Sequence, residues 1–154
     1  MLNNQIHKKW MRYAYLEAMK AYDQKEIPVG AVVVYENKII GKGYNLVETL
    51  NDATAHAEII AITSASEYMR DWRLENCLLY VTLEPCIMCT GAIINSRIKK
   101  VIYGVGDNKA GGCDSLYHLG EDGRLNHNFE LLSGVMEDEI RELMDGFFRE
   151  MRKS

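Results

Sequence analysis

The chain has 154 residues, of which 47% are hydrophobic and 26% charged, and its formal net charge is −4. A chain of this length buries about 70% of its unfolded surface, so we expect one globular domain over residues 1–154 that needs no disulfides. The negative charge argues against a protein that coats nucleic acid through bulk electrostatics. Residues 101–154 hold the acidic excess, with 11 Asp and Glu against 6 Lys and Arg, which leaves room for a basic surface elsewhere.

The apolar runs and the cysteines indicate the cellular compartment of the protein. No stretch approaches the roughly 18 consecutive apolar residues of a membrane span, and the N-terminal segment has no apolar run of signal-peptide length. We therefore expect a cytoplasmic protein with no membrane partner. In a reducing compartment, metal binding or packing explains Cys77, Cys86, Cys89 and Cys113 better than disulfides do. Only Cys86 and Cys89 have the spacing of metal ligands.

The first elements are a helix and a hairpin. Residues 5–25 carry apolar side chains at helical spacing, which predicts an amphipathic helix that ends before Pro28. The β-branched run over residues 29–35 and the segment 38–43 predict two strands joined by a tight turn.

Helices and strands continue to alternate in the rest of the chain. We expect a helix over 54–69 with Thr54 as its N-cap, a strand over 77–82, a helix over 86–95, a strand over 100–104, a loop over 105–126, a strand near 128–132 and a helix over 136–152. This order predicts an α/β fold with three layers, α/β/α, around a mixed five-stranded sheet. No phosphate-binding glycine motif follows a strand, so a nucleotide cofactor has no support.

Two segments at expected helix starts carry candidate metal ligands: Thr54-Ala55-His56-Ala57-Glu58 and Glu84-Pro85-Cys86-Ile87-Met88-Cys89. Residues three apart on a helix share a face, with their Cβ atoms about 5–6 Å apart, so Cys86 and Cys89 can reach one ion. A helix N-terminus favours the thiolate form. His56 can supply a third ligand, and one imidazole with two thiolates suits Zn²⁺ better than harder cations.

The number of ligands indicates a catalytic site. Three protein ligands leave a fourth zinc position open, as in catalytic sites, and a water bound there has a pKa of about 7. Glu58 is the candidate for moving protons between this water and a substrate. Its spacing from His56 does not by itself settle whether it reaches the water, because residues i and i+2 lie on different helix faces.

Two other sites are compatible with the C-x-x-C motif alone. One is a redox dithiol, and the other is a structural zinc site with Cys113, His118 or His127 as its fourth ligand. The combination of H-x-E with P-C-x-x-C, 30 residues apart from His56 to Cys86, is however the signature of zinc deaminases. The combination therefore favours catalysis.

At these residues the chain resembles the cytidine-deaminase-like superfamily, and within it the bacterial tRNA-specific adenosine deaminases. H-A-E and E-P-C-x-M-C are shared with guanine and cytosine deaminases, so a zinc deaminase of a free base is the alternative. More specific to the tRNA family are Trp72–Glu75, Ser96–Ile98, the loop from Asp107 to Leu116, and Phe147-Phe148.

The resemblance implies roles for site residues. One Zn²⁺ per subunit would be held by His56, Cys86 and Cys89, and Glu58 would shuttle protons. Asn45, the Ala57 backbone N–H and Val29 would bind the base. The reaction would be hydrolytic deamination of the wobble adenosine to inosine in a tRNA anticodon stem-loop, through a water that zinc activates.

The resemblance also implies partners. Members of the family are homodimers, with residues of the neighbouring subunit near each active site. Phe147 and Phe148 are adjacent and cannot both face one core, so one of them is expected to stack on substrate or partner. If RNA is the substrate, basic residues should lie around the zinc cleft and most of the acidic excess away from it. The candidate RNA contacts are Arg73, Arg97, Asp107, Lys109, Phe147, Phe148 and Arg149.

Overall fold

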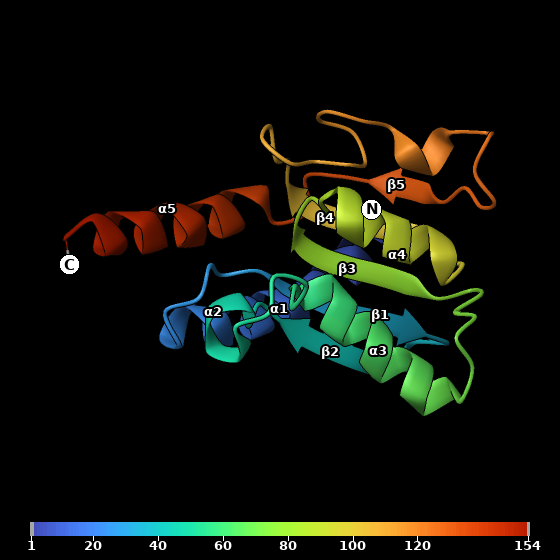
Figure 1. Cartoon of the computed structure of the whole chain (residues 1–154), viewed down its shortest axis with the longest axis horizontal. Helices are drawn as coiled ribbons and strands as arrows, with labels where there is room; N and C mark the ends of the chain where they lie inside the picture. The colour runs from blue at the N-terminus through green and yellow to red at the C-terminus, as the bar shows by residue number, and fades with distance from the viewer. Residues whose placement is uncertain (1, 154) are drawn as a thin grey trace.

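The computed structural model describes residues 2–153, whose five strands form one mixed sheet in the order β2-β1-β3-β4-β5 (Figure 1). Strand β1 is antiparallel to β2 and β3, whereas β3, β4 and β5 are parallel. The elements are α1 (Leu2–Asp23), β1 (Gly30–Tyr35), β2 (Lys38–Tyr44), α2 (Val47–Leu50), α3 (Ala57–Met69), β3 (Leu78–Leu83), α4 (Ile87–Asn95), β4 (Lys100–Val105), the 3₁₀ helix η1 (Leu119–Glu121), β5 (Glu130–Leu132) and α5 (Glu137–Lys153).

Helices cover both faces of the sheet, which confirms the expected three-layer α/β/α architecture. Helices α3 and α4 pack on one face, where Ala61 of α3, Ile93 of α4 and Val33 of β1 belong to one buried apolar cluster. Helix α1 and the first turns of α5 pack on the other face, where Met11 and Ile140 meet the rest of the second apolar cluster. Because successive strand side chains point to opposite faces, a strand covered on both sides is apolar throughout, as β1 is.

Two glycines in β2 let α3 pack directly against the sheet. A Cβ atom at Gly43 would lie 2.3 Å from the carbonyl oxygen of Ala57, and one at Gly41 would lie 2.4 Å from that of Ala61. Both alanines are fully buried. Small side chains on both elements thus set the position of α3, and with it the position of the residue that precedes the helix.

The start of α3 differs from the sequence expectation. Thr54 is not the N-cap, because its hydroxyl and its backbone N–H both donate to Oδ1 of Asp52, at 2.7 and 2.8 Å. This local turn uses the Thr54 side chain, and the helix begins later, with His56 as its N-cap. The sequence expectation also omitted α2 and η1, which have four and three residues and are too short to show a helical period.

One edge of the sheet collects the segments that form the site. The C-terminal ends of β2, β3 and β4 and the N-terminal end of β1 all lie at this edge. Helices α3 and α4 begin there and run away from it (Figure 1). Among residues 2–153, no helix is both long enough and apolar enough to cross a membrane.

Candidate functional site

His56, Cys86 and Cys89 form a cluster at this edge. Their ligand atoms lie within 4.8 Å of one another. Nδ1 of His56 is 3.6 Å from Sγ of Cys86 and 3.5 Å from Sγ of Cys89. The three side chains can therefore hold one metal ion together, although His56 and Cys86 are 30 residues apart in sequence.

The cluster is built from two helix starts. His56 and Cys86 are the N-caps of α3 and α4, and both have extended backbones, with φ/ψ of −77°/153° and −72°/177°. Since His56 precedes the helix, the rule that residues i and i+2 diverge on a helix surface does not apply to it and Glu58. Both side chains line the same cavity.

The electrostatics of the cluster favour a thiolate at Cys86, while the hydrogen bond to Cys86 and burial raise the pKa of the Cys89 thiol. Each helix N-terminus points unpaired N–H groups and the positive end of its dipole towards the site. A hydrogen bond with Cys89 and a further one with His56 lower the pKa of the Cys86 thiol to about 4. Cys86 is thus a thiolate at neutral pH, the form that binds metal.

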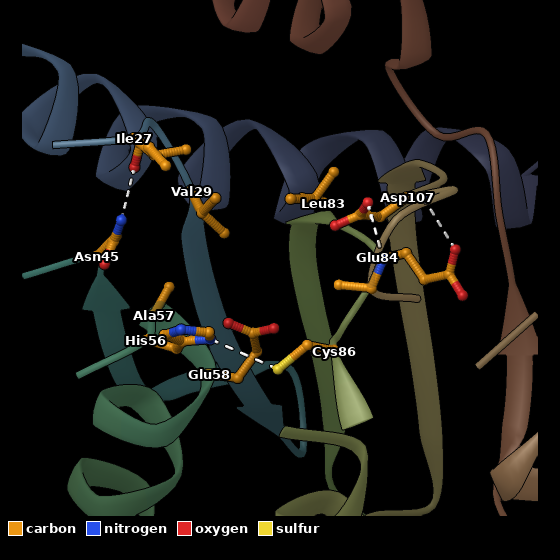
Figure 2. A pocket seen from close by; sticks show the side chains of 11 residues that line it. Ile27, Val29, Asn45, His56, Ala57, Glu58, Leu83, Glu84, Cys86 and Asp107 are labelled. Atoms are coloured by element: carbon orange, nitrogen blue, oxygen red, sulfur yellow. Dashed lines mark hydrogen bonds between the residues drawn. The ribbon is translucent and has the colours of Figure 1, made fainter. Parts of the chain in front are cut away.

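A cavity of about 200 Å³ opens beside the cluster (Figure 2). Pockets for drug-sized ligands are typically about 300–1,000 Å³, so this cavity suits a smaller planar group. The Glu58 carboxylate points into it between Val29 and Cys86 (Figure 2). The cavity is lined by Ile27, Val29, Asn45, His56, Ala57, Glu58, Leu83, Glu84, Cys86, Asp107 and Ala110.

Glu58 is nearly inaccessible, with 3% of its surface exposed. Burial raises the pKa of its carboxyl group to about 7. A carboxyl group in this range can both accept and release a proton near neutral pH, which is the property that a general acid and base requires.

Asn45 is held in a fixed orientation at the cavity wall. Its Nδ2 donates to the carbonyl oxygen of Ile27 at 3.2 Å, and its Oδ1 accepts from the N–H of Val47 at 3.2 Å. An amide has two N–H donors and two lone pairs, so one of each is left for a ligand. Asn45, Ala57 and Val29, singled out from the sequence, therefore lie together around one cavity.

Five of the candidate RNA contacts lie near this cavity. Asp107 is part of its wall. Lys109, Phe148 and Arg149 line a separate hollow of about 480 Å³, together with Asp145 and Arg152. Phe147 lines another hollow, of about 560 Å³, which shares Ile27, Asn45 and His56 with the cavity.

The adjacent phenylalanines differ in environment, as their side-by-side position predicts. Phe147 is 5% exposed and packs edge-on against Tyr22 of α1, with ring centroids 5.5 Å apart. Phe148 is 39% exposed.

Charge is unevenly distributed along α5, since Glu137, Asp138 and Glu139 occupy its first turn and Arg152 and Lys153 its last. The half of α5 that borders the cavity region is thus its basic end.

Arg73 and Arg97 lie elsewhere. Their guanidinium carbons are 5.0 and 5.8 Å from the ring centre of Trp72, so the three side chains form one cluster. They follow the C-terminal ends of α3 and α4. Because α3 has 13 residues that rise about 1.5 Å each, this cluster is about 20 Å from the helix end that carries His56.

None of the three alternative fourth ligands joins the metal cluster within residues 2–153. Sγ of Cys113 lies 3.5 Å from Oγ1 of Thr90, and Nε2 of His127 lies 2.6 Å from the carbonyl oxygen of Ile98. His118 pairs with Asp114, at 3.5 Å. The geometry therefore favours a three-ligand site over a closed structural one.

Two buried glutamates, one at the cavity and one at the adjoining hollow, have roles that no sequence motif predicts. Glu26 accepts hydrogen bonds from the N–H groups of Glu48 and Thr49 and so holds α2 in place. Glu84 accepts hydrogen bonds from the loop after β4. Although burial raises the pKa of Glu84, bonds from Ser115 and from backbone N–H groups outweigh it and lower the pKa below its usual value. The signal available for Glu84 was a single acidic residue directly after the apolar strand β3.

Comparison with known proteins identifies the family. The profile of the MafB19-like deaminases matches residues 5–152. A tRNA-specific adenosine deaminase of Bacillus subtilis is 45% identical over 94% of this chain and 89% of its own length. A solved structure from studies of A-to-I editing by tRNA:A34 deaminases has a TM-score of 0.84 and 39% identity, over 88% of this chain and 98% of that one.

A second solved structure has a different substrate. The guanine deaminase of Bacillus subtilis is 40% identical with a TM-score of 0.62, and the match covers 65% of this chain and 64% of that one. The tRNA deaminases match over a larger share of the chain. The chain therefore belongs to the tRNA-specific adenosine deaminase family.

Proposed function

We propose that residues 1–154 form one domain that hydrolyses the wobble adenosine of a tRNA anticodon to inosine. The observation that carries this proposal is the His56, Cys86 and Cys89 cluster beside a small cavity that Glu58 enters. The tRNA deaminase relatives support the choice of substrate. The bases of an anticodon loop are unpaired, so one base can enter such a cavity without the cost of opening a duplex.

Zn²⁺ fits the donor set of the cluster. Typical Zn–N and Zn–S bond lengths in a tetrahedral site place the nitrogen and sulfur atoms about 3.5 Å apart. The two distances from Nδ1 of His56 to the cysteine sulfurs, 3.6 and 3.5 Å, agree with this separation. We propose one Zn²⁺ per subunit. When bound, it lowers the pKa of a water molecule enough for attack at neutral pH.

The other residues of the cavity transfer protons and bind the base. Glu58 takes one proton from the attacking water and delivers it to N1 of adenine. It then carries the second proton of that water, from the new C6 hydroxyl, to the exocyclic amino group. A C6–O bond forms, the C6–N bond breaks, and ammonia leaves. The free N–H and lone pair of Asn45 and the N–H of Ala57 hold the edge of the base, and Val29 contacts its face.

Contacts with the rest of the RNA are proposed for the residues near the cavity. Lys109 and Arg149 would bind phosphates, and the exposed ring of Phe148 would stack on a base. Asp107 would contact the bound nucleotide at the cavity wall. Phe147 would contact RNA from the wall of the hollow that shares Ile27, Asn45 and His56 with the cavity.

A homodimer would use the outer faces of α3 and α4. Ile59, Ile87 and Met88 are partly or largely exposed on these helices. A Cβ atom at Gly91 would meet no atom within 4 Å, so a partner helix can approach α4 closely there. A two-fold axis across these helices would reverse them in the partner and carry its Arg73 and Arg97 towards this cavity. We propose that these two arginines contact RNA in that way.

The proposed activity also gives a location. All four cysteines are free thiols that form no disulfide, and thiolate metal ligands need reducing conditions. We propose that the protein acts in the cytoplasm, on the tRNA present there.

The substrate assay is the direct test. The protein, supplied with Zn²⁺, is incubated separately with a tRNA that has adenosine at the wobble position, the same tRNA with guanosine there, free guanine, free cytosine and adenosine. Inosine should form only at the wobble adenosine, as measured by nucleoside mass spectrometry. Ammonia release from guanine or cytosine, with the tRNA unchanged, would contradict the proposal and favour the alternative of a free-base deaminase.

Glu58→Gln tests the proton carrier, because the amide keeps the shape of the side chain but cannot accept a proton. The value of kcat should fall at least about 10²-fold, the usual contribution of general acid-base catalysis. Zinc content, measured by atomic emission, should stay at one per subunit. Glu67→Gln, an exposed position on the same helix, is the matched control. An unchanged kcat for Glu58→Gln would refute the mechanism.

Arg149→Ala tests a phosphate contact. Loss of one contact should raise the KM for the anticodon stem-loop and reduce the slope of log K against log salt concentration by about 1. Arg141→Ala is the control, since Arg141 lies on the same helix nearer its acidic start. The two arginines are matched in having one acidic partner each on α5, Glu137 for Arg141 and Glu142 for Arg149. Equal effects of the two substitutions on the salt slope would argue against a specific contact.

Gly91→Arg tests the dimer. The wild-type protein should have twice the chain mass of 17.6 kDa by light scattering. The new side chain meets nothing within one subunit, so the variant should fold but be monomeric. Gly123→Arg, at a second open glycine, should remain dimeric. A wild-type monomer, or a dimeric Gly91→Arg variant, would exclude an interface across α4.

A further inference from the structure

Glu84 is a buried carboxylate that the proposed reaction does not use. It follows the last residue of β3, precedes Pro85 and Cys86, and is 2% exposed. Its backbone N–H donates to the carbonyl oxygen of Val105, at 2.8 Å, which fixes it between the ends of β3 and β4. A charge taken out of water at this depth is strongly destabilising unless several donors compensate it.

The compensating donors all come from one short segment. Oε1 accepts from the N–H of Asp107, at 3.0 Å, and from the hydroxyl of Ser115. Oε2 accepts from three successive N–H groups, those of Cys113 at 3.2 Å, Asp114 at 2.8 Å and Ser115 at 2.9 Å. Consecutive N–H groups of this kind form a concave anion site. A carboxylate has about four lone pairs, so these five donors leave it none for a substrate.

The segment from Gly106 to Ser115 depends on this carboxylate for its shape. It contains no helix or strand beyond a single β-bridge between Gly111 and Cys86. The carboxylate also packs against Gly111, where a Cβ atom would lie 2.4–2.5 Å from its atoms. One further bond, from the N–H of Gly112 to the carbonyl oxygen of Pro85 at 2.9 Å, joins the loop to the same stretch of chain.

The loop delivers one wall of the cavity. Asp107 and Ala110 line it, and Asp107 lies on the side away from Asn45 (Figure 2). Oδ1 of Asp107 accepts from the N–H groups of Lys109 and Ala110, at 3.0 and 3.3 Å, so the turn between the two wall residues is itself fixed. Glu84 holds the start and the end of the segment that contains this turn.

We propose that Glu84 is a positioning residue: through its hydrogen bonds to Asp107 and to residues 113–115, it sets the cavity wall against which the base is bound. This inference rests on the proposed deaminase function. Glu84 is one of the residues around the cavity, but its carboxylate bonds the loop and not the base or the metal cluster. It acts through the loop from Gly106 to Ser115, and chiefly through Asp107.

Glu84→Gln is the first test, because it keeps the volume and replaces one acceptor by an NH₂ group that faces N–H donors. The KM for the anticodon stem-loop should rise about tenfold or more, with a smaller fall in kcat and with zinc content unchanged. Amide hydrogen exchange of residues 106–115 should accelerate at least tenfold. Glu17→Gln, a buried carboxylate on α1 that bonds Lys20, is the control and should change neither.

A double-mutant cycle with Asp107→Ala shows whether Glu84 acts through the loop. If it does, Glu84→Gln should raise KM much less in the Asp107→Ala background than in the wild type. Additive effects on KM, together with equal losses of Tm for Glu84→Gln and Glu17→Gln, would reduce Glu84 to a structural residue and overturn the proposal.

Gly111→Ala provides a second route that leaves Glu84 in place. The added methyl group collides with the carboxylate, so KM should rise and exchange of residues 106–115 should accelerate, as for Glu84→Gln. This test remains available if the Glu84→Gln protein does not fold. Gly123→Ala, in the same connection with open space around it, should behave as wild type. Unchanged exchange in Gly111→Ala would overturn the inference. The exchange measurement needs no substrate, so it stands even if the substrate assay refutes the deaminase proposal.

Discussion

The start of two helices at one edge of the sheet is the constraint on which the site depends. Helices α3 and α4 each begin with an N-cap residue in extended conformation, His56 and Cys86, and each directs its unpaired N–H groups to the same point. The dipoles stabilise thiolates and the negative charge that develops on an attacking water. An extended cap also frees its side chain from the helix surface. A ligand from each cap, a third from the first turn of α4 and a carboxylate from the first turn of α3 can therefore share one small space.

Much of this arrangement could be predicted from the sequence. The apolar runs of β1, β3 and β4 and the alternation of strand and helix patterns predict the layered fold. The spacing of His56, Glu58, Cys86 and Cys89 indicates a deaminase site because few other sites need that combination. The exact start of α3 could not be predicted, since Asp52 and Thr54 form a competing turn that any capping rule reads as a helix start. The separation of Arg73 and Arg97 from the cavity follows from helix lengths and from the topology of the sheet, and neither is visible in a motif.

Buried glutamates were the other omission, and the reason is general. A carboxylate that binds backbone N–H groups leaves no signature in its partners, because every residue but proline has an N–H. Glu26 and Glu84 each gather such groups from a segment far along the chain, and the two segments lie on different sides of the cavity. The conformation of these segments is thus fixed by hydrogen bonds to two buried carboxylates, and not by a periodic pattern of apolar residues.

The glycines of β2 have a consequence for how the protein tolerates change. Gly41 and Gly43 pack against the backbone of α3, and the buried alanines opposite them leave no free space between helix and sheet. An added methyl group at this contact would move α3 as a rigid body, and His56 with it. Tightly packed elements transmit such displacements instead of absorbing them. Residues that never meet a substrate therefore govern the ligand separation, so the chemistry of this protein is sensitive to volume changes one to three helical turns from where it occurs.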